Sequence, residues 1–170
     1  MIEPILLAAA RVSTFLGHRP LTNASGFFFE RDALPETAVF HAFTPAHLCA
    51  PEERVEVGSS LLIVGFPLGF HDTLHHMPVV RRCVLASAFG LRFKGEGYFL
   101  TDARTHRCTS GVPVVLRAST DDAALGGLPW KLLGVHSARL DAGSRDRDMD
   151  EALGPNTAWY ADILLTLTEG

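Results

Sequence analysis

The residue with the clearest capacity for chemistry in this sequence is Ser110. The stretch from Phe99 to Val115 reads FLTDARTHRCTSGVPVV, in which a strand leads into a tight loop with Ser110 and Gly111 at its apex, and an apolar strand with an early proline follows. Such a turn exposes a serine hydroxyl beside successive backbone N–H groups, as acyl transfer requires of its nucleophile and oxyanion hole. Ser110 is therefore the candidate nucleophile, although the same pair of residues also occurs in plain turns.

Several histidines could take part in chemistry as ligands or bases. His71 and His75 have the i, i+4 spacing that binds a metal on a helix, with His76 beside them. Their segment has the composition of a loop and offers no obvious third ligand, so we expect exposed loop histidines and no metal site. His136 lies in an apolar strand, where a contact with substrate and a partly buried structural role are both open.

The three cysteines argue against a covalent or metal framework. Cys49, Cys83 and Cys108 are odd in number and widely spaced, without a CxxC pair. This pattern predicts neither a disulfide framework nor a structural zinc, and it favours a reducing compartment. Residues 1–16 lack the features of a secretory signal or a membrane span, because Glu3 replaces the positive charge of a signal and Arg11 interrupts a short apolar run. We expect a cytoplasmic protein without a membrane partner.

Composition limits the classes of fold and partner. The chain has 170 residues, 47% of them hydrophobic and 20% charged, so it can bury a core of its own. Fifteen Lys and Arg residues against nineteen Asp and Glu residues leave a formal net charge of −4. That balance lacks the basic excess that binding to a phosphate backbone requires, and we expect no nucleic-acid partner.

The elements that must position Ser110 are predicted to be mainly β-strands. Short, β-branched apolar runs are separated by glycine- and proline-rich turns, which is typical of strands. A C-terminal helix is predicted after Asn156, because Trp159, Ile163 and Leu164 recur at helical spacing. The predicted strands are Ala8–Leu16, Ser25–Glu30, Ser60–Gly65, Val79–Ala86, Gly97–Thr101, Val112–Leu116 and Lys131–Ala138.

The serine segment resembles that of the trypsin-like serine peptidases of the chymotrypsin superfamily, in particular the bacterial branch that includes the Deg/HtrA proteases. In those proteins T-D-A, a short spacer and G-x-S-G-G/S-P surround the nucleophile, and here the segment reads TDA from Thr101 and CTSGVP from Cys108. Three further segments resemble the family in the expected order: LIVGFPLG at 62–69, RRCVLAS at 81–87 and LGVHSA at 133–138. Four motifs in order make the resemblance specific.

The resemblance implies a fold, an activity and a set of site residues. The fold would be a mainly β, trypsin-like double barrel with an incomplete first barrel and a C-terminal helix, divided into an N-terminal lobe and link (1–53) and a C-terminal barrel (54–170). The activity would be hydrolysis of peptides or proteins through an acyl-enzyme on Ser110, without a cofactor. Substrate would contact the cleft-lining strand at three residues, Val135, His136 and Ser137.

The sequence departs from the family where the catalytic base should be. The family places its histidine and acidic residue before the serine, but here the segment after Glu30 that would carry them is missing. TPAHLC at 44–49 is similar to the motif around the base of the animal enzymes, which makes His47 a candidate base, with Glu52 and Glu53 nearby. Only ten residues separate His47 from Gly58, where the second barrel begins. A surface histidine in the link between lobes is the alternative.

The nucleophile loop also departs from the family. Cys108 stands in place of a glycine whose N–H, with that of Ser110, completes the oxyanion hole, and a cysteine there can turn the donor away. Val112 replaces a small residue and is expected to crowd the loop.

Three interpretations follow from these departures. The chain is an impaired serine peptidase, or an inactive peptide-binding module or degenerate gene product with a peptidase fold, or a chain from which a segment after Glu30 has been omitted. Substrate preference and oligomeric state stay open.

Overall fold

The computed structural model describes residues 3–29, 40–49, 53–105, 109–118, 125, 127–139 and 155–168 of the chain. Within these residues the secondary structure is mainly β, with one short α-helix, α2 (Ile163–Leu167), and 3₁₀ turns that include Pro4–Leu7 and Pro45–His47. The strands are β1 (Ala9–Leu16), β2 (Arg19–Phe27), β3 (Ser60–Gly65), β4 (Val79–Leu85), β5 (Tyr98–Asp102), β6 (Pro113–Arg117), β7 (Trp130–Arg139) and β8 (Asn156–Tyr160).

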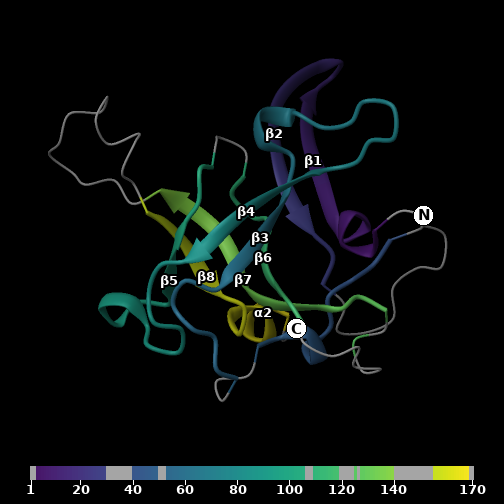
Figure 1. Cartoon of the computed structure of the whole chain (residues 1–170). Coiled ribbons are helices and arrows are strands. Elements are labelled where there is room, and N and C mark those ends of the chain that lie inside the picture. Colours follow the sequence, from purple (N-terminus) through teal and green to yellow (C-terminus); the bar gives the residue numbers. More distant parts are fainter. Residues whose placement is uncertain are drawn as a thin grey trace, which may run out of the picture.

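Six of the strands close into an antiparallel barrel. Their order around the barrel is β3-β4-β5-β8-β7-β6, and β6 pairs back onto β3 to complete it (Figure 1). Closure gives every strand a partner on both sides over its paired part, which removes the long exposed edges that an open sheet would have. The prediction of a mainly β protein with a closed barrel and a terminal helix is confirmed.

The barrel is filled by alternate residues of its strands. Successive side chains of a strand point to opposite faces, so β3 sends Leu61 and Ile63 into the barrel. Three aromatic rings pack against one another in this core, with centroids 5.1 to 5.4 Å apart: Phe89, Phe99 and Tyr160. The interior is therefore a packed core.

The N-terminal lobe is a two-stranded hairpin that rests on the outside of the barrel. β1 and β2 pair only with each other in the described sheets, and they project away from the barrel in Figure 1. The lobe is attached by a second apolar cluster, in which Ile5, Ala8 and Phe43 pack against residues of β3, β6 and β7. The hairpin thus depends on the barrel for its burial.

The prediction of a helix from Asn156 is wrong at its start. Asn156–Tyr160 forms β8, which is paired between β5 and β7, and only Ile163–Leu167 is helical. The Asn156 side chain does not cap a helix, because its Nδ2 donates to the Ala103 carbonyl and its Oδ1 accepts from Thr105 Oγ1 at 2.6 Å. No helix among the described residues is long and apolar enough to cross a membrane.

Candidate functional site

Ser110 lies on an exposed turn that enters β6 beside the end of β7. The turn is held to β7 by two backbone hydrogen bonds: the Gly111 N–H donates to the His136 carbonyl at 2.8 Å, and the His136 N–H donates to the Val112 carbonyl at 2.9 Å. The Ser110 hydroxyl donates to the carbonyl of Ser137. The structure therefore brings Ser110 next to the strand that carries Val135, His136 and Ser137.

Gly111 fits this turn for two separate reasons. Its φ of +86° lies in the left-handed region that favours glycine. In addition, a Cβ on Gly111 would lie 2.6 Å from the carbonyl oxygen of Ser25, which belongs to β2. Ser25 is anchored to the barrel in turn, because its Oγ accepts the Phe66 N–H at 3.0 Å. The candidate nucleophile thus sits where the hairpin meets the barrel.

Val112 is accommodated by a glycine on a neighbouring strand. Its side chain is fully buried in the barrel core, and Gly65 of β3 lies opposite. A Cβ on Gly65 would overlap Cγ1 of Val112, so the absence of a side chain at Gly65 makes the room that Val112 needs. The expectation that Val112 crowds the loop is wrong for this reason.

One of the two predicted oxyanion donors can be described. Among the described residues the Ser110 N–H donates to no acceptor, as expected of a group that could bind a developing negative charge. The N–H of Gly111 is already used in pairing with His136. Cys108, the other predicted donor, lies outside the described residues. The oxyanion role of both residues stays a prediction.

His47 is held by hydrogen bonds that define its ring nitrogens. Nδ1 accepts the Thr44 N–H at 2.9 Å, which places the ring proton on Nε2. Nε2 lies 3.0 Å from the Leu125 carbonyl and donates to it. His47 is also only 2% exposed, and this burial lowers its pKa. Both nitrogens therefore serve the fold: they close the turn at Pro45–His47 and join it to Leu125.

The structure does not bring His47 and Ser110 together. The segment around His47 meets β7 at Leu132, to whose carbonyl the Cys49 N–H donates, whereas Ser110 meets β7 at Ser137. Five residues of strand correspond to about 16 Å.

No carboxylate orients His47 within the described part of the chain. Glu53 instead binds Lys131, with Oε1 3.0 Å from Nζ, and Glu52 lies outside the described residues. The alternative of a surface histidine is also wrong, because the ring is buried.

His136 faces the interior of the barrel. It pairs across to Ala158, whose side chain belongs to the barrel core, and it is 2% exposed. Its Nδ1 has no hydrogen-bond partner among the described residues, an uncommon state for a buried polar atom. Burial lowers the pKa of His136 to about 4, so the ring is neutral near pH 7.

The end of β7 extends past its neighbour β6. Pairing between the two strands runs from Arg117 with Trp130 to Pro113 with Val135. The backbone of His136, the next residue of β7, forms hydrogen bonds with the turn at Gly111 and Val112. From Ser137 to Arg139 no described strand covers the β6 side of β7. Of the three residues predicted to bind substrate, only Ser137 therefore presents its backbone at this edge.

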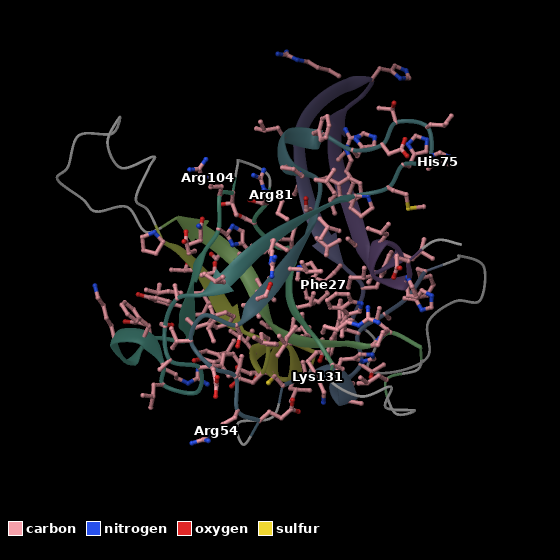
Figure 2. The ribbon with its side chains drawn as sticks, viewed as in Figure 1. Phe27, Arg54, His75, Arg81, Arg104 and Lys131 are labelled. Carbon is pink, nitrogen blue, oxygen red and sulfur yellow. The ribbon has the colours of Figure 1, made fainter. Side chains whose placement is uncertain are left out.

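The described histidine loop and the two described cysteines, Cys49 and Cys83, show no further chemistry. His75 is exposed and bonded to Asp72 at 2.7 Å, on the loop beside the hairpin (Figure 2). The described residues contain no cluster of three or more side chains that could hold a metal. Burial raises the pKa of Cys49 and of Cys83 to about 12, which keeps both thiols protonated and unreactive.

Sequence patterns do not predict three residues that surround the site: Ser25, Gly65 and Leu125. Ser25 lies in a segment, ASGFFF at 24–29, that loosely resembles the family's first barrel, and this was the available signal. Gly65 carries only the general cue that a glycine within a strand marks a close approach. Nothing in the sequence connects Leu125 with His47.

With this geometry the chain has the fold of the trypsin-like proteases. The Rv3671c protease of M. tuberculosis shares it: in its active form the TM-score is 0.54 at 12% identity, over 96% of this chain and 82% of that one. Its inactive form from strain H37Rv, which carries a serine-to-alanine substitution, gives a TM-score of 0.53 at 10% identity, over 98% and 90%. No family profile and no curated protein matches the sequence. At such identities the likeness establishes the fold alone.

Proposed function

We propose that the chain binds an extended peptide along the end of β7, beside Ser110, and does not hydrolyse it through a Ser110–His47 pair. The observation that carries this proposal is the hydrogen bonding of the two residues. The Ser110 hydroxyl donates to the Ser137 carbonyl, and both ring nitrogens of His47 are bonded elsewhere. A serine without a base is a weak nucleophile near neutral pH.

Peptide binding is supported by the geometry of the uncovered edge. An extended segment can add to a free strand edge through backbone hydrogen bonds, and the stretch from Ser137 to Arg139 offers such an edge. The peptide would donate an N–H to the Ser137 carbonyl in place of the Ser110 hydroxyl. A peptide carbonyl beside the turn would accept the Ser110 N–H. The partner is therefore a peptide or an extended segment of a protein.

The absence of hydrolysis is tested with a serine-directed fluorophosphonate probe. We expect the purified chain to show no stoichiometric labelling, because the described residues bring no base to the hydroxyl of Ser110, which donates to the Ser137 carbonyl. The Ser110→Ala variant sets the background, and the His47→Ala variant tests the candidate base. Labelling that both substitutions abolish would contradict the proposal and would show an active serine peptidase.

Binding is tested separately, with unstructured peptides from a casein digest and ¹H–¹⁵N NMR spectra of the chain. We expect saturable shifts of the Ser110, Ser137 and Arg139 amides. Ser110→Ala should bind about five-fold more tightly, because it removes a competing hydrogen bond worth about 1 kcal/mol. Ser60→Ala, an exposed serine elsewhere on the barrel, is the matched control and should leave the affinity unchanged. Shifts that avoid the end of β7 would refute the peptide site.

A further inference from the structure

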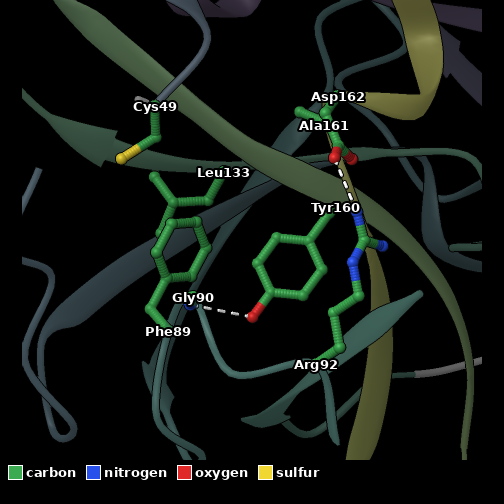
Figure 3. A pocket seen from close by; sticks show the side chains of 8 residues that line it. All are labelled: Cys49, Phe89, Gly90, Arg92, Leu133, Tyr160, Ala161 and Asp162. Atoms are coloured by element: carbon green, nitrogen blue, oxygen red, sulfur yellow. Dashed lines mark hydrogen bonds and ion pairs between the residues drawn. The ribbon is translucent and has the colours of Figure 1, made fainter. Parts of the chain in front are cut away.

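A pocket of about 250 Å³ opens at the other end of the barrel from Ser110. Its walls are the side chains of Phe89, Leu133 and Tyr160, as Figure 3 shows, with the Cys49 side chain at one side. Leu133 lies four residues before Ser137 on β7, which corresponds to about 13 Å of strand. The pocket is thus separate from the edge beside Ser110.

The mouth of the pocket carries an ion pair with unused donors and acceptors. Arg92 donates through one guanidinium nitrogen to Oδ2 of Asp162 at 2.8 Å (Figure 3). The other guanidinium N–H groups and Oδ1 of Asp162 have no partner among the described residues. The Tyr160 hydroxyl accepts the Gly90 N–H at 3.0 Å, which leaves its own proton available to a ligand.

The charges of this pocket cancel. Arg92 and Asp162 contribute one charge of each sign, and the Cys49 thiol is neutral because burial raises its pKa to about 12. A ligand that carries a net charge would therefore be attracted by one member of the pair and repelled by the other. A neutral ligand that offers both a donor and an acceptor matches the pair, and an amide group is such a ligand.

We propose that this pocket binds an aromatic side chain of a polypeptide partner, with the backbone amide groups of that residue on the Arg92–Asp162 pair. The ring packs against the side chains of Phe89, Leu133 and Tyr160 that line the pocket, where aromatic contacts add to apolar burial. The amide carbonyl accepts from Arg92, and the amide N–H donates to Oδ1 of Asp162. This site does not rest on the proposed peptide site beside Ser110, and the two can be tested apart.

The probe is N-acetyl-phenylalaninamide, followed in ¹H–¹⁵N NMR spectra of the full chain. A ligand of this size with one filled pocket should bind with a dissociation constant on the order of 1 mM. We expect saturable shifts of the Gly90, Tyr160 and Ala161 amides, with those of Gly111 and Ser137 unmoved. N-acetylglycinamide, which has the amides without the ring, should cause no saturable shift.

Variants of the ion pair test its part in recognition. Arg92→Leu and Asp162→Leu should each weaken binding at least five-fold, and both side chains are half-exposed, so the fold should persist. The double variant Arg92→Asp with Asp162→Arg restores a donor beside an acceptor and should recover most of the affinity. Lys94→Leu, an exposed cation two residues from Arg92, should change nothing.

Three outcomes would overturn the proposal. One is the absence of saturable shifts, and another is equal binding of the glycine compound. The third is a shift confined to the Trp159 indole, because Trp159 lines a neighbouring hollow of about 190 Å³ that shares Arg92 and Asp162. Failure of the peptide site beside Ser110 would leave these results unaffected, since the two experiments monitor different amides.

Discussion

The closed barrel and the N-terminal hairpin are stabilised in different ways. Each barrel strand has two neighbours, and the barrel encloses a core of its own. The hairpin has one strand pairing, and Ala9 and Phe27 at its ends pack, partly buried, against the apolar cluster on the outer surface of the barrel. A two-stranded sheet alone is marginal in water. The barrel is therefore the stable unit, and the hairpin depends for its stability on the contact surface between the two regions.

The candidate site lies at the junction of these two regions. Gly111, next to Ser110, approaches the Ser25 backbone of the hairpin, while the hydroxyl of Ser110 binds the barrel strand β7. The resemblance of the sequence to the trypsin-like peptidases implies a catalytic base that precedes Ser110, in the N-terminal lobe. Here the described hairpin brings a serine, Ser25, toward the turn, and the buried histidine of the link lies elsewhere.

The largest expected contrast is between core truncations in the two regions. Phe99 is fully buried and packs against both Phe89 and Tyr160, so Phe99→Ala should lower the free energy of unfolding by roughly 3–5 kcal/mol. Val12 on the hairpin is 49% exposed, and Val12→Ala should cost less than about 1 kcal/mol. Urea unfolding monitored by circular dichroism measures both. Similar costs would show that the barrel is not the dominant unit.

The second prediction concerns pH and the buried His136. Burial lowers its pKa from 6.5 to about 4, so between these pH values the unfolded chain binds a proton that the folded chain does not. The stability that this difference provides is present above pH 6.5 and is lost as pH falls to about 4. The loss should be roughly 3 kcal/mol, at about 1.4 kcal/mol for each pKa unit.

The measurement is urea unfolding at pH 7.5 and at pH 4.5, with variants as controls. His136→Phe should remove most of the pH dependence, and His75→Ala on the exposed loop should keep it. His47 also contributes to the loss of stability at low pH, since burial lowers its pKa as well. Equal pH dependence in His136→Phe and in the unaltered chain would disprove the assignment to His136.

The smallest of the three expected effects on stability is at Gly65, whose missing side chain leaves room for Val112. Gly65→Ala should destabilise the barrel by about 1–3 kcal/mol, because the added methyl overlaps the Val112 side chain. The double variant Gly65→Ala with Val112→Ala should recover part of this loss, as measured in a double-mutant cycle. Strictly additive effects would mean that the two positions do not compete for the same space.

Most of the barrel could be predicted from the sequence. Local patterns are enough to predict these elements. Short apolar runs between turn residues indicate strands, as at residues 60–65 and 79–86, and Ser110 with Gly111 indicates a turn. The spacing of Trp159, Ile163 and Leu164 predicts a helix from Asn156, whereas the structure has a strand at its start. Pairing with β5 and β7 decided that residues 156–160 are a strand, and no local pattern carries that information.

The sequence by itself determined the mainly β class and the position of Ser110 on a turn between two strands. Only the tertiary structure decided the roles of the histidines. His47 bonds a carbonyl 78 residues away, at Leu125, and His136 is buried because its strand closes the barrel beside Ala158. Turns and strands arise from interactions between near neighbours in the chain. The environment of a side chain arises from residues that only folding brings together, and that environment decides which nitrogen is free and which proton can move.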